Sequence, residues 1–123
     1  MKVGEIMTPN AISVSENAPV REVAQVLDKH RISGLPVCED GRVIGVVSEA
    51  DLIGKSGATV GEVMTWPAVT VSETTGLEHV AELLTQQRIR RVPVVNADGQ
   101  LMGVVSRRDV LRWAASRVPA AKG

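Results

Sequence analysis

The sequence predicts an α/β protein made of two β-α-β-β-α repeats related by an internal pseudo-twofold axis, with small mixed sheets packed against helices. Residues 3–53 match residues 60–111 at a shift of 57, which becomes 58 after Asp98, and 22 of 51 aligned pairs are identical. Both copies also show the same order of apolar patterns. Because about 50 residues cannot bury both faces of a sheet, we expect the apolar faces of the two repeats to meet and form one pseudo-twofold α/β unit.

The first half of each repeat predicts a strand and a helix. The segments 3–7 and 60–64 are followed by "AISV" and "AVTV", whose alternation of apolar and polar residues indicates a brief strand. Apolar residues then recur at i, i+3, i+4 and i+7 from Val20 and from Leu77, which is the period of a helix with one buried face. Pro19 suits the start of the first of these helices.

The second half of each repeat predicts a hairpin and a last helix. "GLPVC" and "VPVV" are joined through glycine-containing turns to "RVIGVV" and "QLMGVV". Pro36 and Pro93 lie near strand starts, where a missing N–H is tolerated. The last helices should begin at Ser48 and Ser106, and the second should reach Ser116. These boundaries give a first repeat (1–53), a linker (54–59), a second repeat (60–117) and a tail (118–123).

Composition narrows the function classes. The chain has 123 residues, no net charge, no phenylalanine or tyrosine and one cysteine, Cys38, in an apolar stretch where an inert core thiol is expected. Nucleic-acid binding is therefore not expected, and neither is an internal disulfide or a metal cluster. No apolar stretch approaches the roughly 18 residues of a membrane span, and no secretory signal is present, so a cytoplasmic location is expected.

The motif "GVVSEAD" (45–51) recurs as "GVVSRRD" (103–109) and allows two interpretations. Ser-x-x-Asp before an apolar run is a capping box, which stabilises a helix start by about 1 kcal/mol and needs no ligand. The same groups, placed twice after a strand end, also suit a nucleotide: free helix N–H groups attract phosphate, and a carboxylate one turn later accepts ribose hydroxyls. Gly45 and Gly103 would either admit a ligand to the strand or allow close packing of a helix.

Besides "GVVSEAD" and "GVVSRRD", the chain repeats "VGEIMTPNAISV" as "VGEVMTWPAVTV" and "HRISGLPV" as "RIRRVPV". With these three pairs of motifs, the chain over 3–111 resembles a tandem pair of cystathionine-beta-synthase (CBS) domains, a Bateman module. The resemblance implies adenine-nucleotide binding, with ribose on Asp51 and Asp109 and phosphate on the hydroxyls of Ser48 and Ser106. It further implies a pocket that surrounds the adenine, lined by residues near the first strand and by the strand prolines: Thr8, Asn10, Ala11, Ile12, Thr65, Pro67, Ala68, Val69, Pro36 and Pro93.

Arginines make the two expected sites unequal. Arg90 and Arg91 stand where the first copy has Ser33 and Gly34, so we expect them to complete the phosphate site of Asp51 across the twofold axis. Arg107 and Arg108 would compensate at the Asp109 site. The alternative is that these arginines form a solvated basic surface.

No nucleophile, general base or phosphate-binding loop is apparent, so we expect no enzyme and no required cofactor. The leading hypothesis is a stand-alone regulatory module that binds AMP, ADP, ATP, NAD or S-adenosylmethionine between the repeats. The alternative is a structural dimerisation scaffold with empty clefts. By resemblance, we expect a homodimer through helices of both repeats and a separate effector protein. The candidate dimer residues are Val110, Leu111, Trp113 and Ala114, although Trp113 is equally suited to packing within its own chain.

Overall fold

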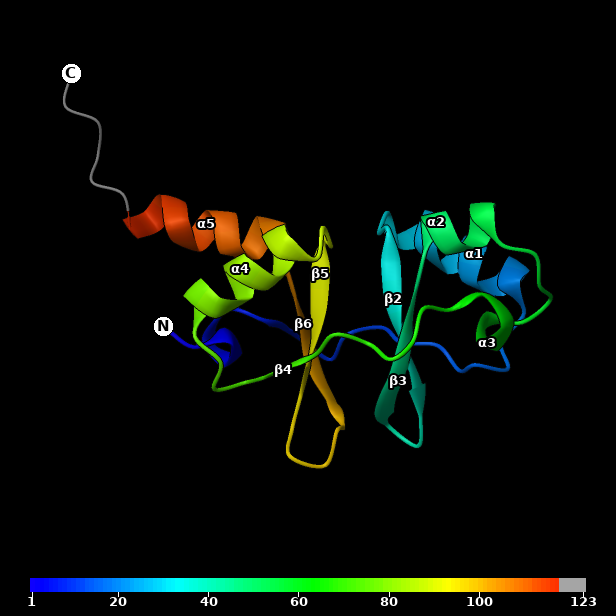
Figure 1. Cartoon of the computed structure of the whole chain (residues 1–123), viewed down its shortest axis with the longest axis horizontal. Coiled ribbons are helices and arrows are strands. Elements are labelled where there is room, and N and C mark those ends of the chain that lie inside the picture. The colour runs from blue at the N-terminus through cyan, green and yellow to red at the C-terminus, as the bar shows by residue number, and fades with distance from the viewer. Residues whose placement is uncertain (118–123) are drawn as a thin grey trace, which may run out of the picture.

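Two lobes lie side by side in the computed structural model, which describes residues 1–117 (Figure 1). The elements, in chain order, are the 3-10 turn η1 (Val3–Glu5), β1 (Thr8–Pro9), α1 (Val20–His30), β2 (Gly34–Glu39), β3 (Arg42–Ser48), α2 (Glu49–Gly54), α3 (Val60–Val63), β4 (Val71–Ser72), α4 (Leu77–Gln86), β5 (Arg91–Val95), β6 (Leu101–Ser106) and α5 (Arg107–Arg117). The predicted tail, 118–123, lies outside the described residues.

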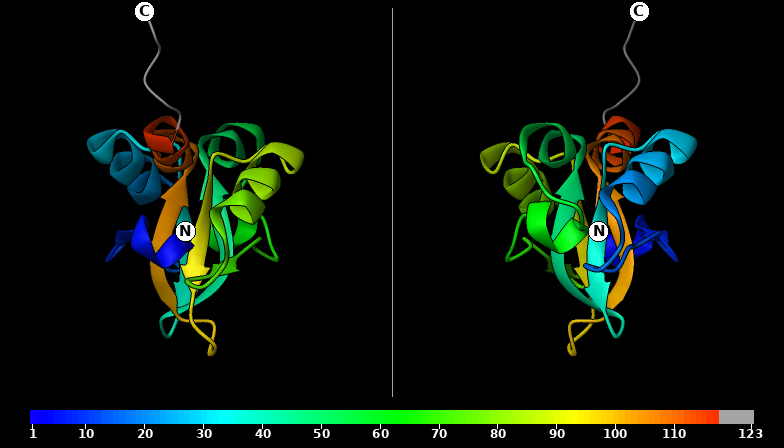
Figure 2. Two further views of the ribbon diagram at one scale, coloured as in Figure 1. Left: turned by 90° about the vertical axis from the view of Figure 1, so that its left-hand side faces the viewer. Right: turned by 90° about the vertical axis from the view of Figure 1, so that its right-hand side faces the viewer.

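The predicted α/β fold class and its two hairpins are confirmed. β2 pairs with β3 and β5 with β6, both antiparallel, and their turns use Gly41 and Gly99 at φ +80°. The hairpin tips also bond to each other across the pseudo-twofold axis, from the Val43 amide to the Gly99 carbonyl (3.1 Å) and from the Leu101 amide to the Gly41 carbonyl (2.9 Å). Helices gather at one end of the molecule and these tips at the other (Figure 2).

Each repeat lends its first segment to the sheet of the other repeat. β1 pairs with β6, Thr8 opposite Val104, and at the related position Thr65 bridges to Val46 of β3. A Cβ on Gly103 would lie 2.6 Å from the Thr8 carbonyl oxygen. Gly45 and Gly103 therefore admit a crossing strand; the expectation that they admit a ligand or a helix was wrong, because only the crossing of segments between repeats brings this backbone against them.

The buried side chains form two clusters, one in each lobe. One, around α4, β5 and β6, includes Val3 from the N-terminal turn. The other, around α1, β2 and β3, includes Val60 and Val63 from α3. Each sheet is covered by its own helices together with a segment from the other repeat.

The brief strands predicted at "AISV" and "AVTV" are shorter than expected. Val14 forms a single parallel bridge to Val37, and the second copy forms only β4, parallel to β5. Ile12 and Val69 are exposed, 40% and 36%, so only the last apolar residue of each stretch gains from packing on the sheet. Within residues 1–117, no helix is both long and apolar enough to cross a membrane.

Candidate functional site

Both Ser-x-x-Asp motifs form the helix starts that the sequence predicts. The Asp51 amide donates to the Ser48 Oγ (3.3 Å), and Asp51 Oδ2 accepts from the Ser48 amide (3.0 Å). At the start of α5, the Asp109 amide donates to the Ser106 Oγ (3.2 Å), and Asp109 Oδ2 accepts from the Ser106 amide (2.9 Å). The capping-box interpretation therefore holds in both copies, and each acid keeps its second oxygen, Oδ1, outside the box.

The second oxygen of Asp51 is already occupied. Its Oδ1 accepts from Lys55 Nζ at 2.9 Å and from the Thr65 hydroxyl at 3.1 Å. Burial raises the pKa of Asp51, but the hydrogen bonds from Lys55, Ser48 and Thr65 and the Lys55 charge outweigh burial and leave this pKa below its ordinary value. Asp51 is thus held ionised within contacts made by its own chain.

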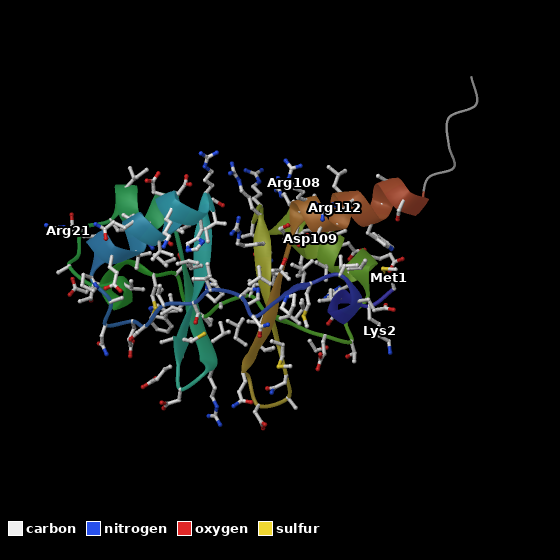
Figure 3. The ribbon with its side chains drawn as sticks, turned by 180° about the vertical axis from the view of Figure 1, so that it is seen from behind. Met1, Lys2, Arg21, Arg108, Asp109 and Arg112 are labelled. Atoms are coloured by element: carbon white, nitrogen blue, oxygen red, sulfur yellow. The ribbon has the colours of Figure 1, made fainter. Side chains whose placement is uncertain are left out.

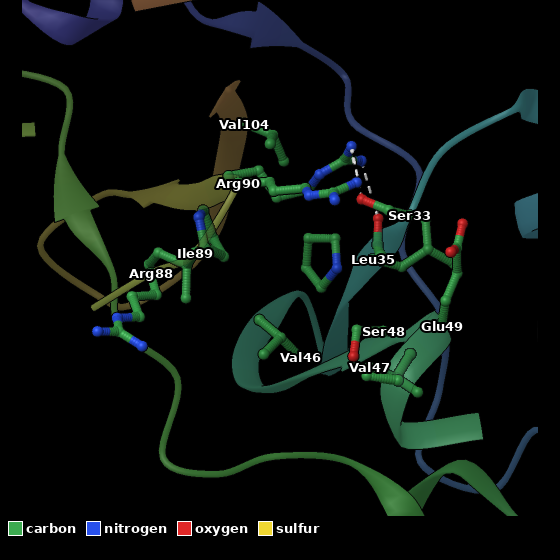
Figure 4. A pocket seen from close by; sticks show the side chains of 15 residues that line it. Ser33, Leu35, Val46, Val47, Ser48, Glu49, Arg88, Ile89, Arg90 and Val104 are labelled. Atoms are coloured by element: carbon green, nitrogen blue, oxygen red, sulfur yellow. Dashed lines mark hydrogen bonds between the residues drawn. The ribbon is translucent and has the colours of Figure 1, made fainter. Parts of the chain in front are cut away.

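A cavity of about 360 Å³ lies between the two hairpins (Figure 4). Ser48 and Glu49, at the start of α2, line one side, and Arg88 and Arg90 of the second repeat line the other. Its walls are otherwise mostly apolar and come from both sheets: Leu35, Pro36, Val46, Val47, Ile89, Pro93 and Val104. An apolar cavity with cationic groups along one wall suits an aromatic ligand that carries an anion.

Arg91 links the repeats beside this cavity. Its guanidinium donates to the Gly34 carbonyl (3.0 Å) and to the Ser33 hydroxyl (3.3 Å), while its buried Nε has no hydrogen-bond partner. Burial and then the Arg90 charge lower the pKa of Arg91, and Glu49 and Asp109 oppose that change. Arg91 therefore contributes positive charge between the two lobes while holding them together.

A second, more open groove of about 1080 Å³ runs from Ser106 along α4 and α5. Its lining includes five arginines, Arg31, Arg90, Arg91, Arg107 and Arg108, against one acid, Glu49. Figure 3 shows Arg108 beside Asp109 near the gap between the lobes. Arg107 is partly committed to the fold, because its Nε donates to the Ile89 carbonyl at 3.0 Å.

The predicted site residues fall into three groups. Pro36, Ser48, Arg90, Arg91 and Pro93 line the cavity, and Arg90, Arg91, Ser106, Arg107 and Arg108 line the groove. The two acids lie one turn into their helices and line neither. The residues expected around adenine lie on or next to the crossing segments and line neither: Thr8, Asn10, Ala11, Ile12, Thr65, Pro67, Ala68 and Val69.

Sequence reasoning missed Lys55, Arg31 and Glu49. Lys55 follows Asp51 by four residues, and this spacing on a helix signals an ion pair. Arg31 and Arg88 are related by the internal repeat, and both adopt a left-handed backbone with φ near +53°, at or just after the ends of α1 and α4. No sequence signal placed Glu49 among the arginines. Across residues 1–117, no group of three or more His, Cys, Asp or Glu side chains is arranged to hold a metal ion.

Known proteins share this sequence pattern. The CBS domain family model matches residues 3–57 and 60–116. CBS domain-containing protein CBSX2, chloroplastic, from Arabidopsis thaliana is 32% identical over 149 residues, covering 91% of this chain and 63% of the relative. Inosine-5'-monophosphate dehydrogenase from Thermoplasma acidophilum is 28% identical over 107 residues, covering 86% of this chain and 22% of that enzyme. The chain thus spans less than two thirds of either relative.

Solved structures share the fold over nearly the whole chain. The crystal structure of CBSX2 in complex with AMP matches with a TM-score of 0.89 at 35% identity, covering 94% of this chain and 96% of that one. The CBS domain pair of MJ0100, in complex with 5'-methylthioadenosine and S-adenosyl-L-methionine, matches with a TM-score of 0.88 at 27% identity, covering 96% and 98%. From its two matched repeats and its fold, this chain belongs to the CBS domain family as a tandem CBS pair.

Proposed function

We propose that this chain is a regulatory module that binds an adenosine-type ligand between its two CBS repeats and performs no catalysis. The observation that carries the proposal is the cavity in which Ser48 of the first repeat faces Arg88 and Arg90 of the second. The structures of CBSX2 with AMP and of MJ0100 with adenosyl compounds support the ligand class. AMP, ADP, ATP, NAD and S-adenosylmethionine are the candidates.

The roles of the residues follow from their chemistry. Asp51 and Asp109 would accept ribose hydroxyls, and the phosphates would meet Ser48, Ser106 and the neighbouring arginines, Arg90, Arg91, Arg107 and Arg108. Guanidinium groups form charge-assisted and potentially bidentate bonds to phosphate. The crossing segments with Thr8, Asn10–Ile12, Thr65 and Pro67–Val69, together with Pro36 and Pro93, would border the adenine.

Calorimetric titration and thermal unfolding with each candidate ligand test this function. A ligand at 100 times its Kd adds about 2.7 kcal/mol to the free energy of unfolding. For a domain of this size that is a rise of about 10 °C in Tm. No binding heat and no shift in Tm with any of these ligands would refute the function.

A substitution in the cavity wall tests the phosphate role of a single residue. Arg90 lines both the cavity and the groove, so Arg90→Gln should weaken phosphate-bearing ligands by roughly 10- to 100-fold. Arg21→Gln is the matched control, because Arg21 lies at the far end of the molecule (Figure 3). Equal affinities of both variants would contradict the phosphate role of Arg90.

A homodimer through the helices is a further part of the proposal. Ile53 on α2 and Leu111 on α5 are related by the internal repeat and are 86% and 67% exposed. Val110 and Trp113, which the sequence also offered for this surface, pack against the core of the second repeat instead. The double variant Ile53→Asp, Leu111→Asp should convert a dimer to a monomer in light scattering, and an unchanged mass would contradict this surface.

The regulatory role implies a protein that responds to the ligand. A ligand shifts such a response only by binding one state more tightly than the other. We propose a separate effector protein and a cytoplasmic location. Cross-linking in the presence and absence of ligand, followed by mass spectrometry, tests the first, and cell fractionation tests the second.

A further inference from the structure

The two capping acids, one in each repeat, have different surroundings. Asp51 and Asp109 occupy equivalent positions and form the same capping box, but they differ outside it. Asp51 Oδ1 accepts from Lys55 Nζ (2.9 Å) and from the Thr65 hydroxyl (3.1 Å). Near Asp109 Oδ1 the nearest cation is Arg112, whose Nη1 lies 3.9 Å away, beyond hydrogen-bond distance.

The two acids differ in how many further hydrogen bonds their Oδ1 atoms can accept. Each carboxylate oxygen accepts about two hydrogen bonds. Both lone pairs of Asp51 Oδ1 are therefore used by its own chain, whereas Asp109 Oδ1 keeps room for two donors. The neighbouring hydroxyls of a ribose are two such donors. Asp109 is also the more accessible acid, with 16% of its side chain exposed against 9% for Asp51.

The lysine that contacts Asp51 has no equivalent in the second repeat. The residue at the Lys55 position of the second repeat is Trp113, which packs against the core of that repeat and brings no ammonium group to Asp109. Lys55 also donates to the Val63 carbonyl at 3.1 Å, so it ties the end of α2 to α3 while it covers Asp51. Thr65 corresponds to Thr8, and within residues 1–117 the Thr8 hydroxyl makes no hydrogen bond to Asp109.

The charges beside the two capping serines, Ser48 and Ser106, differ in the same sense. The groove at Ser106 is lined by five arginines and one glutamate, while the cavity at Ser48 is lined by three arginines and the same glutamate. Arg107 donates to backbone carbonyls, and Arg91 donates to Gly34 and Ser33. This leaves Arg31, Arg90 and Arg108 as the exposed cations for a ligand. A phosphorylated ligand suits this groove, and a cationic sulfonium ligand does not.

From these contacts we infer that the chain binds one phosphorylated adenosine ligand, with its ribose on Asp109, and that Lys55 keeps Asp51 from accepting a second ribose. This inference rests on the proposed function and assigns it to one of the two sites. The half-exposed Lys55 side chain, 47% accessible, is then the residue that determines stoichiometry. Removing its ammonium group frees one lone pair of Asp51 Oδ1 for a second ligand.

Calorimetric titration of the full chain with AMP, ADP and S-adenosylmethionine tests the inference. The wild type should bind one equivalent of ADP per chain, and S-adenosylmethionine at least about tenfold more weakly. Asp109→Asn should weaken ADP binding roughly 10- to 100-fold. Lys55→Met should gain a second, weaker equivalent, and Lys29→Met, on the exposed surface of α1, should not.

Failure of this inference and failure of the proposed function give different results in these titrations. ADP affinity that is unchanged in Asp109→Asn would overturn the assignment and leave the function standing. An unchanged stoichiometry of one in Lys55→Met would overturn the role of Lys55, and this arm does not depend on whether Asp109→Asn folds. S-adenosylmethionine binding as tightly as ADP would overturn the ligand class. Absence of binding in every variant would instead refute the function itself.

Discussion

Replacing Gly103 by alanine should disconnect the N-terminal strand from the sheet of the other repeat. A Cβ at this position would lie 2.6 Å from the Thr8 carbonyl oxygen and 2.8 Å from the Met7 sulfur. Real Cβ atoms do not approach a backbone oxygen so closely, so β1 must move away from β6. The contact is with backbone, and no change of side-chain rotamer can relieve it.

The magnitude follows from what the shift removes. β1 has only two residues, paired as Thr8 with Val104 and Pro9 with Gly103. Val3, shortly before β1, is fully buried in the core of the second repeat. Overpacking of this kind costs about 1–3 kcal/mol, and each lost hydrogen bond about 1 kcal/mol. We expect a loss of about 2–3 kcal/mol, which corresponds to a fall of roughly 8–12 °C in Tm for a domain of this length.

Thermal and urea unfolding followed by circular dichroism measure this change. Gly45→Ala should cost less, because its Cβ would lie 2.9 Å from the Thr65 carbonyl and the crossing there is a single bridge. Gly54→Ala is the matched control. Gly54 lies in α2, and a Cβ added there would have nothing within 4 Å, so the free energy of unfolding should rise by about 0.5 kcal/mol. A Tm of Gly103→Ala equal to that of the wild type would refute the crossing-strand explanation.

Two further predictions concern the core and the pH dependence of stability. Leu77 is fully buried in the core of the second repeat, so Leu77→Ala should lower the free energy of unfolding by about 2–5 kcal/mol in urea titrations, and Val20→Ala, at the half-buried counterpart, by clearly less. Equal losses would contradict the difference in burial between these two positions. The pKa of Asp51 is lower in the folded state, so its ionised form stabilises the fold above pH ~4, and this contribution is lost as pH falls through the folded-state value. Asp51→Asn should therefore lose less stability than the wild type between pH 7 and pH 3, and parallel pH profiles of Tm would contradict the bonds assigned to Asp51.

Much of the local structure is predictable from the sequence because its causes are local. The spacing of apolar residues from Val20 and Leu77 predicts α1 and α4, and the Ser-x-x-Asp pattern predicts where α2 and α5 begin. Each of these signals acts within one or two turns of chain. The internal repeat also predicts that both hairpins exist, since the same local pattern occurs twice.

The candidate site was only partly predictable, for a related reason. Local pattern identified the capping serines and acids, and the arginines that differ between copies were visible in the alignment of the repeats. Whether an acid is free or occupied depends on side chains from other elements. Asp51 meets Thr65, 14 residues away, and Arg91 bonds to Ser33, 58 residues away. No periodicity in the sequence specifies such contacts.

By itself, the sequence determined the two repeats, the order of their elements and the helix starts, because these depend on interactions between near neighbours in the chain. The tertiary structure alone decided that each repeat completes the sheet and the core of the other, and it alone placed Thr65 on Asp51. The physical reason is that chain crossing and the sharing of carboxylate lone pairs depend on which distant segments meet, and that choice is made by packing of the whole chain.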